Sequence, residues 1–157
     1  MMAVVQPSCP SAVAGIVCDS AYFRFEDYFR NYMLKKKYNT LVLKPVLGKI
    51  ERIAGGDVEK CSPSAFIEQV DVPVLFLAGK EDPLTPADQV ETMYAKCGTA
   101  CGNTHKELVW FPSGKEGYLR YADPETYDQA ITLFMEKNPI TTGSSPEILP
   151  EGNGSIE

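Results

Sequence analysis

The sequence predicts an α/β fold in which about three parallel strands are flanked by helices. Three short apolar runs lie along the chain, at Val13–Cys18, Val72–Ala78 and Glu107–Phe111. Runs of this length and composition are typical of strands. Between and after them, apolar residues recur at three- and four-residue spacing, as in helices that bury one face. Because strand and helix alternate along the chain, we expect a parallel sheet whose strands are connected through helices.

The first expected strand, Val13–Cys18, is followed at once by Asp19 and Ser20. Open parallel sheets place ligands and catalytic groups at the carboxyl ends of their strands. Asp19 and Ser20 are therefore candidate supporting residues of a site at this edge. Cys18 falls within the strand, and we interpret it as a small buried hydrophobic residue and not as a thiolate nucleophile.

Two helical segments are expected between the first two strands, at about Phe25–Lys37 and Thr40–Ala54. The second contains Pro45, which lacks a backbone N–H, and Gly48, which lacks a side chain. We therefore expect this helix to be kinked or broken. The short basic run Lys35–Lys37 is interpreted as a solvated helix end.

The second expected strand, Val72–Ala78, is an almost uninterrupted apolar run, which suits a strand that is buried on both faces. Gly79 ends the run, and Lys80–Pro83 turn the chain. Asp82 then lies at the carboxyl end of a parallel strand. This position makes Asp82 the first candidate for a catalytic residue.

A capping box is expected at the start of the next helix, with Thr85 as N-cap, Pro86 at the first helical position and Asp88 reaching back. Gly98 should end this helix. The face that the helix buries should consist of Ala87, Val90, Met93, Tyr94 and Cys97.

The third expected strand, Glu107–Phe111, ends in Pro112-Ser113-Gly114. A final helix should begin at Asp123-Pro124, where an acidic N-cap precedes a proline in the first turn. Its apolar stripe should consist of Tyr127, Ala130, Ile131 and Phe134.

Three segments occur in a telling order along the chain: AGIVCDSAYFRFEDYF (Ala14–Phe29), CSPSAFIEQVDVPVLFLAGKEDPLTP (Cys61–Pro86) and LVWFPSGKEGY. On these segments, from about Met1 to Asn138, the chain resembles the C-terminal half of an α/β-hydrolase of the serine aminopeptidase and esterase type. The resemblance implies a partial α/β-hydrolase fold. In such proteins the first segment follows the nucleophile, the second brings the acid of the catalytic triad and the third brings its histidine. We expect residues 1–138 to form this half-domain and residues 139–157, rich in Pro, Gly, Ser and Thr, to form a disordered tail.

By position, Asp82 matches the triad acid. The family carries its histidine after the third strand, in a loop that resembles P-x-G-x-H-G. This chain reads PSGKEG there, so Glu116 occupies the place of the histidine. The one histidine of the chain, His105, precedes the strand and should lie at the opposite end of the sheet from a catalytic site.

The nucleophile motif Gly-x-Ser-x-Gly occurs nowhere in the 157 residues. Met1–Gln6 resemble the tail of the helix that follows this motif, and we expect the first half of the sheet to lie upstream of Met1. A serine hydroxyl needs a base to take its proton, and the acid only orients that base. The chain of 157 residues should therefore not carry out hydrolysis by a catalytic triad. The sequence does not indicate a substrate.

Two classes of function remain open. The first is a serine hydrolase that acts on esters, lipids or peptides, of which this chain is an inactive fragment. The second is a non-catalytic pseudohydrolase module that binds a protein partner. The free edge of the first strand should expose unpaired backbone groups beside apolar side chains, which favours self-association of the chain.

No cofactor and no metal ion are expected. Asp82, Glu116 and Asp19 all sit at strand ends and offer oxygen ligands for a hard cation, but we interpret them as solvated loop acids. The five cysteines lack the spacing of a zinc site, and reduced thiols suit a cytoplasmic protein.

Composition limits the remaining classes. A chain of 157 residues with 44% hydrophobic residues suits one domain with a core. The net charge of −6 argues against binding to nucleic acids and to anionic membrane surfaces. No apolar segment approaches the ~20 residues that span a bilayer. The N-terminus lacks a basic region followed by a long apolar core, so it does not read as a secretion signal.

Overall fold

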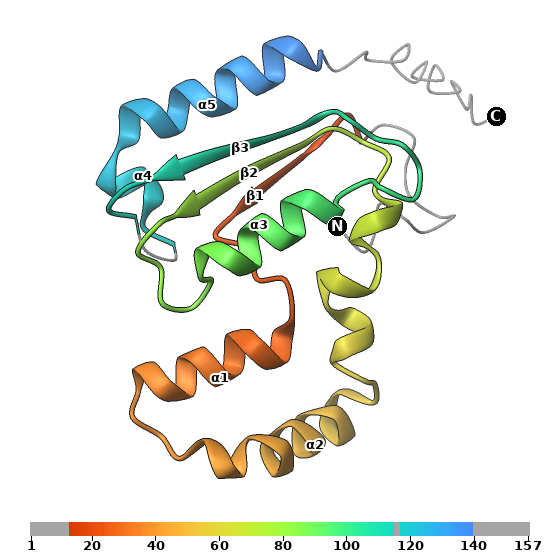
Figure 1. Ribbon diagram of the computed structural model, residues 1–157, viewed down its shortest axis with the longest axis vertical. Coiled ribbons are helices and arrows are strands. Elements are labelled where there is room, and N and C mark those ends of the chain that lie inside the picture. Colours follow the sequence, from red (N-terminus) through yellow and green to blue (C-terminus); the bar gives the residue numbers. More distant parts are fainter. Residues whose placement is uncertain (1–12, 115–116, 140–157) are drawn as a thin grey trace, which may run out of the picture.

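The computed structural model of the chain describes residues 13–114 and 117–139. Its centre is a sheet of three parallel strands in the order β1-β2-β3 (Figure 1). These strands are β1 (Ile16–Asp19), β2 (Val74–Gly79) and β3 (Lys106–Phe111). The predicted α/β fold with a parallel sheet is confirmed, with strand boundaries that differ by a few residues.

The central strand β2 is buried along its whole length, as its apolar run predicts. Successive side chains point to opposite faces of the sheet, so Val74 and Phe76 belong to one core cluster, whereas Leu75 and Leu77 belong to another. The first cluster also contains Cys18, Ile67, Val70, Met93 and Cys97. The second also contains Phe111, Leu119 and Phe134.

A helix covers each face of the sheet. α3 (Ala87–Lys96) covers the first face, and α5 (Pro124–Lys137), with the short α4 (Leu119–Ala122), covers the second (Figure 1). The start of α5 is as predicted, because the Asp123 carboxylate accepts a hydrogen bond from the backbone N–H of Thr126 at 3.0 Å. Its predicted apolar stripe packs against the second core cluster. None of the helices in the described ranges is long and apolar enough to cross a membrane.

The predicted capping box before α3 is wrong. Pro86 occupies the N-cap position, and no side chain caps the helix. The hydroxyl of Thr85 donates instead to the carboxylate of Asp82, at 2.8 Å. A charged carboxylate is a strong acceptor that needs a donor, and it recruits the hydroxyl that the helix would have used. The predicted buried face is correct, since Val90 and Met93 are almost fully buried.

The segment between β1 and β2 forms what we call the helical arm, residues 25–54. It consists of α1 (Phe25–Lys35), a 3₁₀ turn η2 (Thr40–Val42) and α2 (Leu43–Ala54). The arm lies apart from the sheet (Figure 1) and has its own small core of Met33, Leu43 and Leu47. Three further 3₁₀ turns lead back to β2, namely η3 (Glu59–Cys61), η4 (Pro63–Ala65) and η5 (Ile67–Gln69).

The helix predicted over Thr40–Ala54 is divided, but not where its proline and glycine suggest. The division falls between η2 and α2, and α2 itself continues without interruption through Gly48. Pro45 lies in the first turn of α2. Backbone N–H groups in a first turn have no acceptor within the helix, so a proline costs little there.

The start of α1 is held by residues that lie more than thirty positions further along the chain. No side chain next to the helix caps it. Instead, the backbone N–H of Phe25 donates to Ser62 Oγ at 3.0 Å, and the N–H of Glu26 donates to a carboxylate oxygen of Glu59 at 3.2 Å. The arm is thus joined to the segment that leads into β2.

One edge of the sheet is open in the described part of the chain. β1 pairs with β2 alone, through bonds that include Ile16 N–H to Pro73 O and Ser20 N–H to Leu77 O, both 2.9 Å. Because residues of a strand alternate in direction, the backbone groups of Val17 and Asp19 point away from β2. The predicted free edge is therefore present among residues 13–114 and 117–139. The expected disordered tail lies, apart from Pro139, outside the described residues, as do Met1–Gln6.

Candidate functional site

Asp82 lies just beyond the carboxyl end of β2, where the sequence places it. Its side chain is 3% exposed. One carboxylate oxygen accepts the backbone N–H of Leu84 at 2.8 Å and that of Thr85 at 3.4 Å. The other oxygen accepts the hydroxyl of Thr85 at 2.8 Å. The interpretation of Asp82 as a solvated loop acid is therefore wrong, because its own loop buries it and supplies its hydrogen bonds.

These hydrogen bonds hold the carboxylate in a fixed orientation. The oxygen that meets the hydroxyl of Thr85 accepts one hydrogen bond, and a carboxylate oxygen has two lone pairs. Capacity remains for one further donor, such as an imidazole N–H. A buried carboxylate with such capacity has the chemistry that an orienting acid needs.

The loop after β3 packs directly against the turn that leads to Asp82. A Cβ atom on Gly79 would overlap the carbonyl oxygen of Gly114, so only glycine permits this approach. The backbone N–H of Lys80 donates to Phe111 O at 2.9 Å beside it. A Cβ on Gly114 would in turn overlap the side chain of Leu119. Glu116, two residues further on, lies outside the described residues.

His105 lies at the amino end of β3, as the sequence indicates. Its carbonyl oxygen accepts the backbone N–H of Val74, the first residue of β2, at 3.0 Å. Its side chain is exposed. Since Asp82 lies at the carboxyl end of the sheet, the one histidine of the chain is at the opposite end from this acid.

Asp19 and Ser20 lie at the end of β1, where they form a hydrogen-bonded group with Tyr127 of α5. Asp19 accepts the hydroxyl of Ser20 on one carboxylate oxygen and the hydroxyl of Tyr127 on the other, each at 2.9 Å. Burial, and then the hydrogen bond to Asp19, raise the pKa of Tyr127, which keeps this phenol a neutral donor. Tyr127 is not among the predicted site residues, since its place in an apolar stripe gives no sign of what its hydroxyl contacts.

Ser20 has a backbone feature that its sequence does not reveal. Its φ angle is +50°, a left-handed conformation that is rare for residues other than glycine, and its side chain is buried. The serine of a nucleophile elbow likewise has a strained backbone directly after a strand, although Ser20 lacks the flanking glycines of that motif. However, the hydroxyl donates to a carboxylate and not to an imidazole, and a carboxylate is a weak base for a serine. In this chain the group therefore joins β1 to α5.

The other titratable groups form no second site in the described part of the chain. No three side chains of His, Cys, Asp and Glu come together there in a way that would hold a metal ion. The grouping of Asp82, Asp19 and Glu116 stays untested, since Glu116 lies outside that part. Cys18 is buried as expected, and burial raises the pKa of its thiol to about 12, so it stays protonated.

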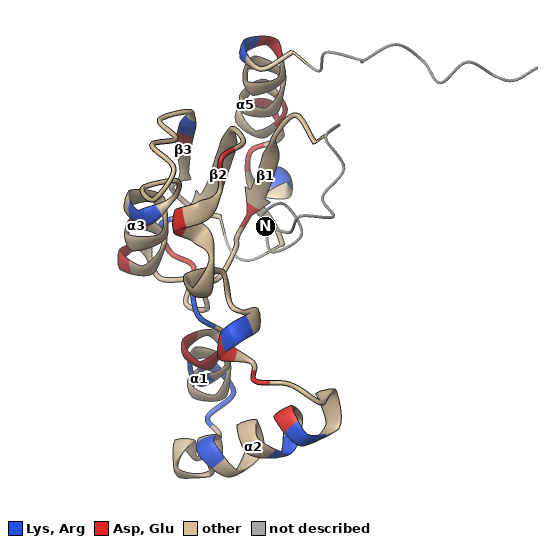
Figure 2. Cartoon of the chain, turned by 90° about the vertical axis from the view of Figure 1, so that its right-hand side faces the viewer, with Lys and Arg blue, Asp and Glu red and all other residues tan. Residues whose placement is uncertain are grey.

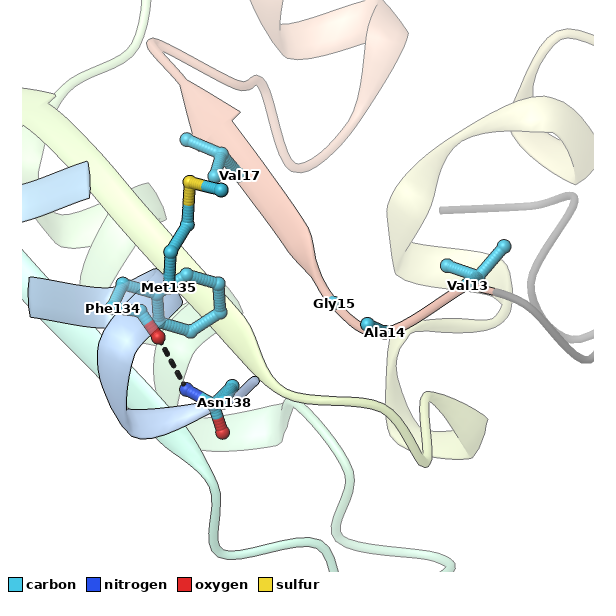
Figure 3. A pocket seen from close by; sticks show the side chains of 7 residues that line it. All are labelled: Val13, Ala14, Gly15, Val17, Phe134, Met135 and Asn138. Carbon is cyan, nitrogen blue, oxygen red and sulfur yellow. Dashed lines mark hydrogen bonds between the residues drawn. The ribbon is translucent and has the colours of Figure 1, made fainter. Parts of the chain in front are cut away.

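A second candidate site runs along the free edge of β1. Val17 is 41% exposed there and borders a pocket on each face of the strand. One pocket has a volume of about 290 Å³ and is lined by Val13, Ala14, Gly15, Val17, Phe134, Met135 and Asn138. Figure 3 shows the side chain of Met135 beside Val17. The other pocket, of about 380 Å³, is lined mainly by apolar residues that include Ile16, Tyr22 and Phe66.

The fold is similar to that of solved esterase structures. A structure of the esterase Pf2001 from Pyrococcus furiosus, in space group P212121, superimposes with a TM-score of 0.59 at 15% sequence identity, covering 87% of this chain and 48% of that chain. A second crystal form, in space group P21, gives a TM-score of 0.59 at 14% identity, covering 87% and 47%. The chain thus spans about half the length of these esterase chains. At this identity the likeness shows a shared fold. No family model and no curated protein matches the sequence.

The contact between the two loops predicts opposite effects of the same substitution at two glycines. Gly79→Ala should lower the free energy of unfolding by at least about 2 kcal/mol, because the new methyl group would push Gly114 away. Gly48→Ala should raise it by about 0.5–1 kcal/mol, since nothing lies within 4 Å of a Cβ there and alanine favours a helix. Urea denaturation measures both. Equal effects of the two substitutions would contradict the close approach of Gly79 and Gly114.

Proposed function

We propose that this chain supplies the acid-bearing part of a hydrolase that acts on esters, lipids or peptides, with Asp82 in the role of the triad acid. The observation that carries the proposal is the buried carboxylate of Asp82, fixed by its own loop just beyond the carboxyl end of β2. Such an edge is where parallel sheets hold catalytic groups. The shared fold with an esterase supports the choice of this reaction class.

In this reaction class the acid accepts a hydrogen bond from an imidazole and stabilises its cationic form, and the imidazole takes the proton of the nucleophile. Asp82 fits the first role, because Thr85 and the N–H of Leu84 already orient its carboxylate. We propose the position of Glu116 for the imidazole, two residues after Gly114, which packs against Gly79. Glu116 itself does not serve as this base. A second carboxylate near Asp82 would raise the pKa of one of the two acids, and it does not have the proton-transfer chemistry of an imidazole.

On this proposal the 157-residue chain by itself does not hydrolyse esters, lipids or peptides. Its sequence has no Gly-x-Ser-x-Gly, and its one histidine lies at the far end of the sheet. The backbone of Ser20 is strained, but its hydroxyl donates to the carboxylate of Asp19 and not to an imidazole. We propose residues 1–138 as the half-domain of this hydrolase fold.

A second candidate function is binding of a protein through the free edge of β1, with no catalysis. The outward backbone groups of Val17 and Asp19 offer hydrogen bonds for an added strand, and an apolar pocket lies on each face beside them. The partner that this edge fits most directly is a second copy of the chain. Two copies of β1 related by a two-fold axis would present the same groups to each other.

The proposed role of Asp82 predicts the behaviour of a histidine introduced by Glu116→His. Near the Asp82 carboxylate its pKa should rise above the ordinary value of about 6.5, because the charged imidazolium gains a partner. Adding Asp82→Asn should return it toward that value. NMR titration measures both, in a background of His105→Gln that removes the other histidine signal. An unchanged pKa in the chain with Asp82 would contradict the proposed place of the base.

The absence of catalysis predicts that a fluorophosphonate probe does not label the folded chain and that the chain does not hydrolyse p-nitrophenyl esters above the buffer rate. Ser20→Ala is the matched control, since Ser20 is the described serine with strained backbone after a strand. Labelling that Ser20→Ala abolishes would show that Ser20 is a nucleophile and would overturn this part of the proposal. A folded chain is verified by circular dichroism.

The free edge predicts that the chain self-associates with rising concentration. Val17→Lys should shift it to monomer, because a lysine on an edge strand opposes strand pairing. Tyr121→Lys, at a side chain that is 86% exposed on α4, should leave the association unchanged. Light scattering measures the mass of each variant. A chain that stays monomeric at every concentration would refute association through β1.

A further inference from the structure

The charges of the chain are divided unevenly between the helical arm and the rest. Residues 25–54 contain seven Lys or Arg and three Asp or Glu, a net charge of +4. The whole chain has a net charge of −6, which leaves −10 for the remaining residues. In Figure 2 basic residues recur along α2 and in the segment between α1 and α2. A partner with negative charge would therefore meet the arm first.

The three acidic side chains of the arm already have partners. Glu26 accepts hydrogen bonds from Lys44 at 2.8 Å and from Arg30 at 2.9 Å, and these two cations lower its pKa, Lys44 most strongly. Asp27 lies 3.8 Å from Arg24, and Glu51 accepts the backbone N–H of Val58 at 3.4 Å. Glu26 and Asp27 are thus paired with cations, and only the charge of Glu51 is left to offset the other cations of the arm.

Five basic side chains of the arm form no ion pair with any described residue: Lys35, Lys36, Lys37, Lys49 and Arg52. All five residues are exposed. On α2, the exposed positions carry Lys44, Lys49 and Arg52 and no acidic residue. The outer surface of the arm is therefore a basic one, although the protein as a whole is acidic.

Large apolar side chains are exposed among these cations. Half of the exposed large apolar side chains in the described residues belong to the arm, namely Leu34, Tyr38, Leu41, Val42 and Ile53. Leu41 is 86% and Ile53 is 76% exposed. Tyr38, Leu41 and Val42 follow Lys35–Lys37 directly, in the connection between the two helices. Exposed apolar groups gathered on one part of a surface mark an interaction site.

The end of α1 holds a lysine at a position that favours glycine. The backbone N–H of Lys37 donates to Leu34 O at 2.9 Å, and that of Tyr38 donates to Met33 O at 2.8 Å. This is the Schellman pattern, and Lys37 adopts its left-handed conformation with a φ of +58°. A lysine there carries a backbone cost that glycine would avoid. Lys37→Gly therefore removes one charge without weakening the fold.

We propose that the helical arm docks on the surface of an anionic lipid bilayer, with its five unpaired cations facing the headgroups and its exposed apolar side chains entering the boundary between headgroups and acyl chains. Basic and apolar side chains side by side on helices are typical of such interfacial binding. A nucleic acid would use the cations but would leave Leu41 and Ile53 in water. The net charge of −6, which by itself argues against an anionic surface, hides this division.

Co-sedimentation with vesicles tests the proposal, using the full 157-residue chain and either phosphatidylcholine alone or phosphatidylcholine with phosphatidylserine. The chain should bind the vesicles that contain phosphatidylserine and not the neutral ones. Lys36→Gln, Lys37→Gly and Lys49→Gln together should weaken this binding by about tenfold or more. Leu41→Ser with Ile53→Ser should weaken it as well, because the apolar anchor is lost.

Matched control variants keep the outcome specific to the arm. Lys96→Gln, Arg120→Gln and Lys137→Gln remove the same charge from outside the arm, and Tyr121→Ser with Leu133→Ser removes apolar surface that is exposed elsewhere. Both controls should retain binding. The proposal is overturned if the chain ignores anionic vesicles, if the controls lose binding equally, or if a single-stranded RNA binds more tightly than vesicles and tolerates the loss of Leu41 and Ile53.

Discussion

The two-sided burial of β2 is the constraint on which the described structure depends. A parallel strand that is apolar on both faces needs a cover on each, and α3 and α5 supply these covers from the two segments that follow β2 and β3. The sheet then places the ends of its three strands at one edge. The register of the strands brings three features to that edge: Asp82, the group around Asp19 and the loop after β3.

The main features of this fold follow from periodicity, and the sequence therefore predicts them well. The apolar run of β2 and the apolar stripe of α5 predict burial directly, because the hydrophobic effect removes such side chains from water whichever residues they pack against. Hydrogen-bond partners do not follow in this way. The hydroxyl of Thr85 could cap the start of α3 or donate to the buried carboxylate of Asp82. In the structure it donates to Asp82. Only the folded geometry decides between two such acceptors.

For the candidate site, too, the sequence predicts where residues lie along the strands but not which contacts their side chains make. The sequence and its resemblance to hydrolases put Asp82 at a strand end, but they give no sign of its burial or of the glycine contact that holds the neighbouring loop. They also name Asp19 and Ser20 without the third member of the group, since the hydroxyl of Tyr127 meets Asp19 across 108 positions of the chain. Likewise a net charge of −6 is a sum, and a sum carries no information on where the cations of the arm are gathered.

The core of the helical arm shares none of its buried residues with the two core clusters of the sheet. A segment with its own core can open as a separate cooperative unit, at a lower free energy than global unfolding. Hydrogen bonds from Phe25 and Glu26 hold its base, and Asn31 donates to Leu84 O, in the loop that buries Asp82. Motion of the arm would therefore reach the carboxylate of Asp82 through Leu84, whose backbone N–H donates to that carboxylate, and a surface that restrained the arm would also restrain Asp82.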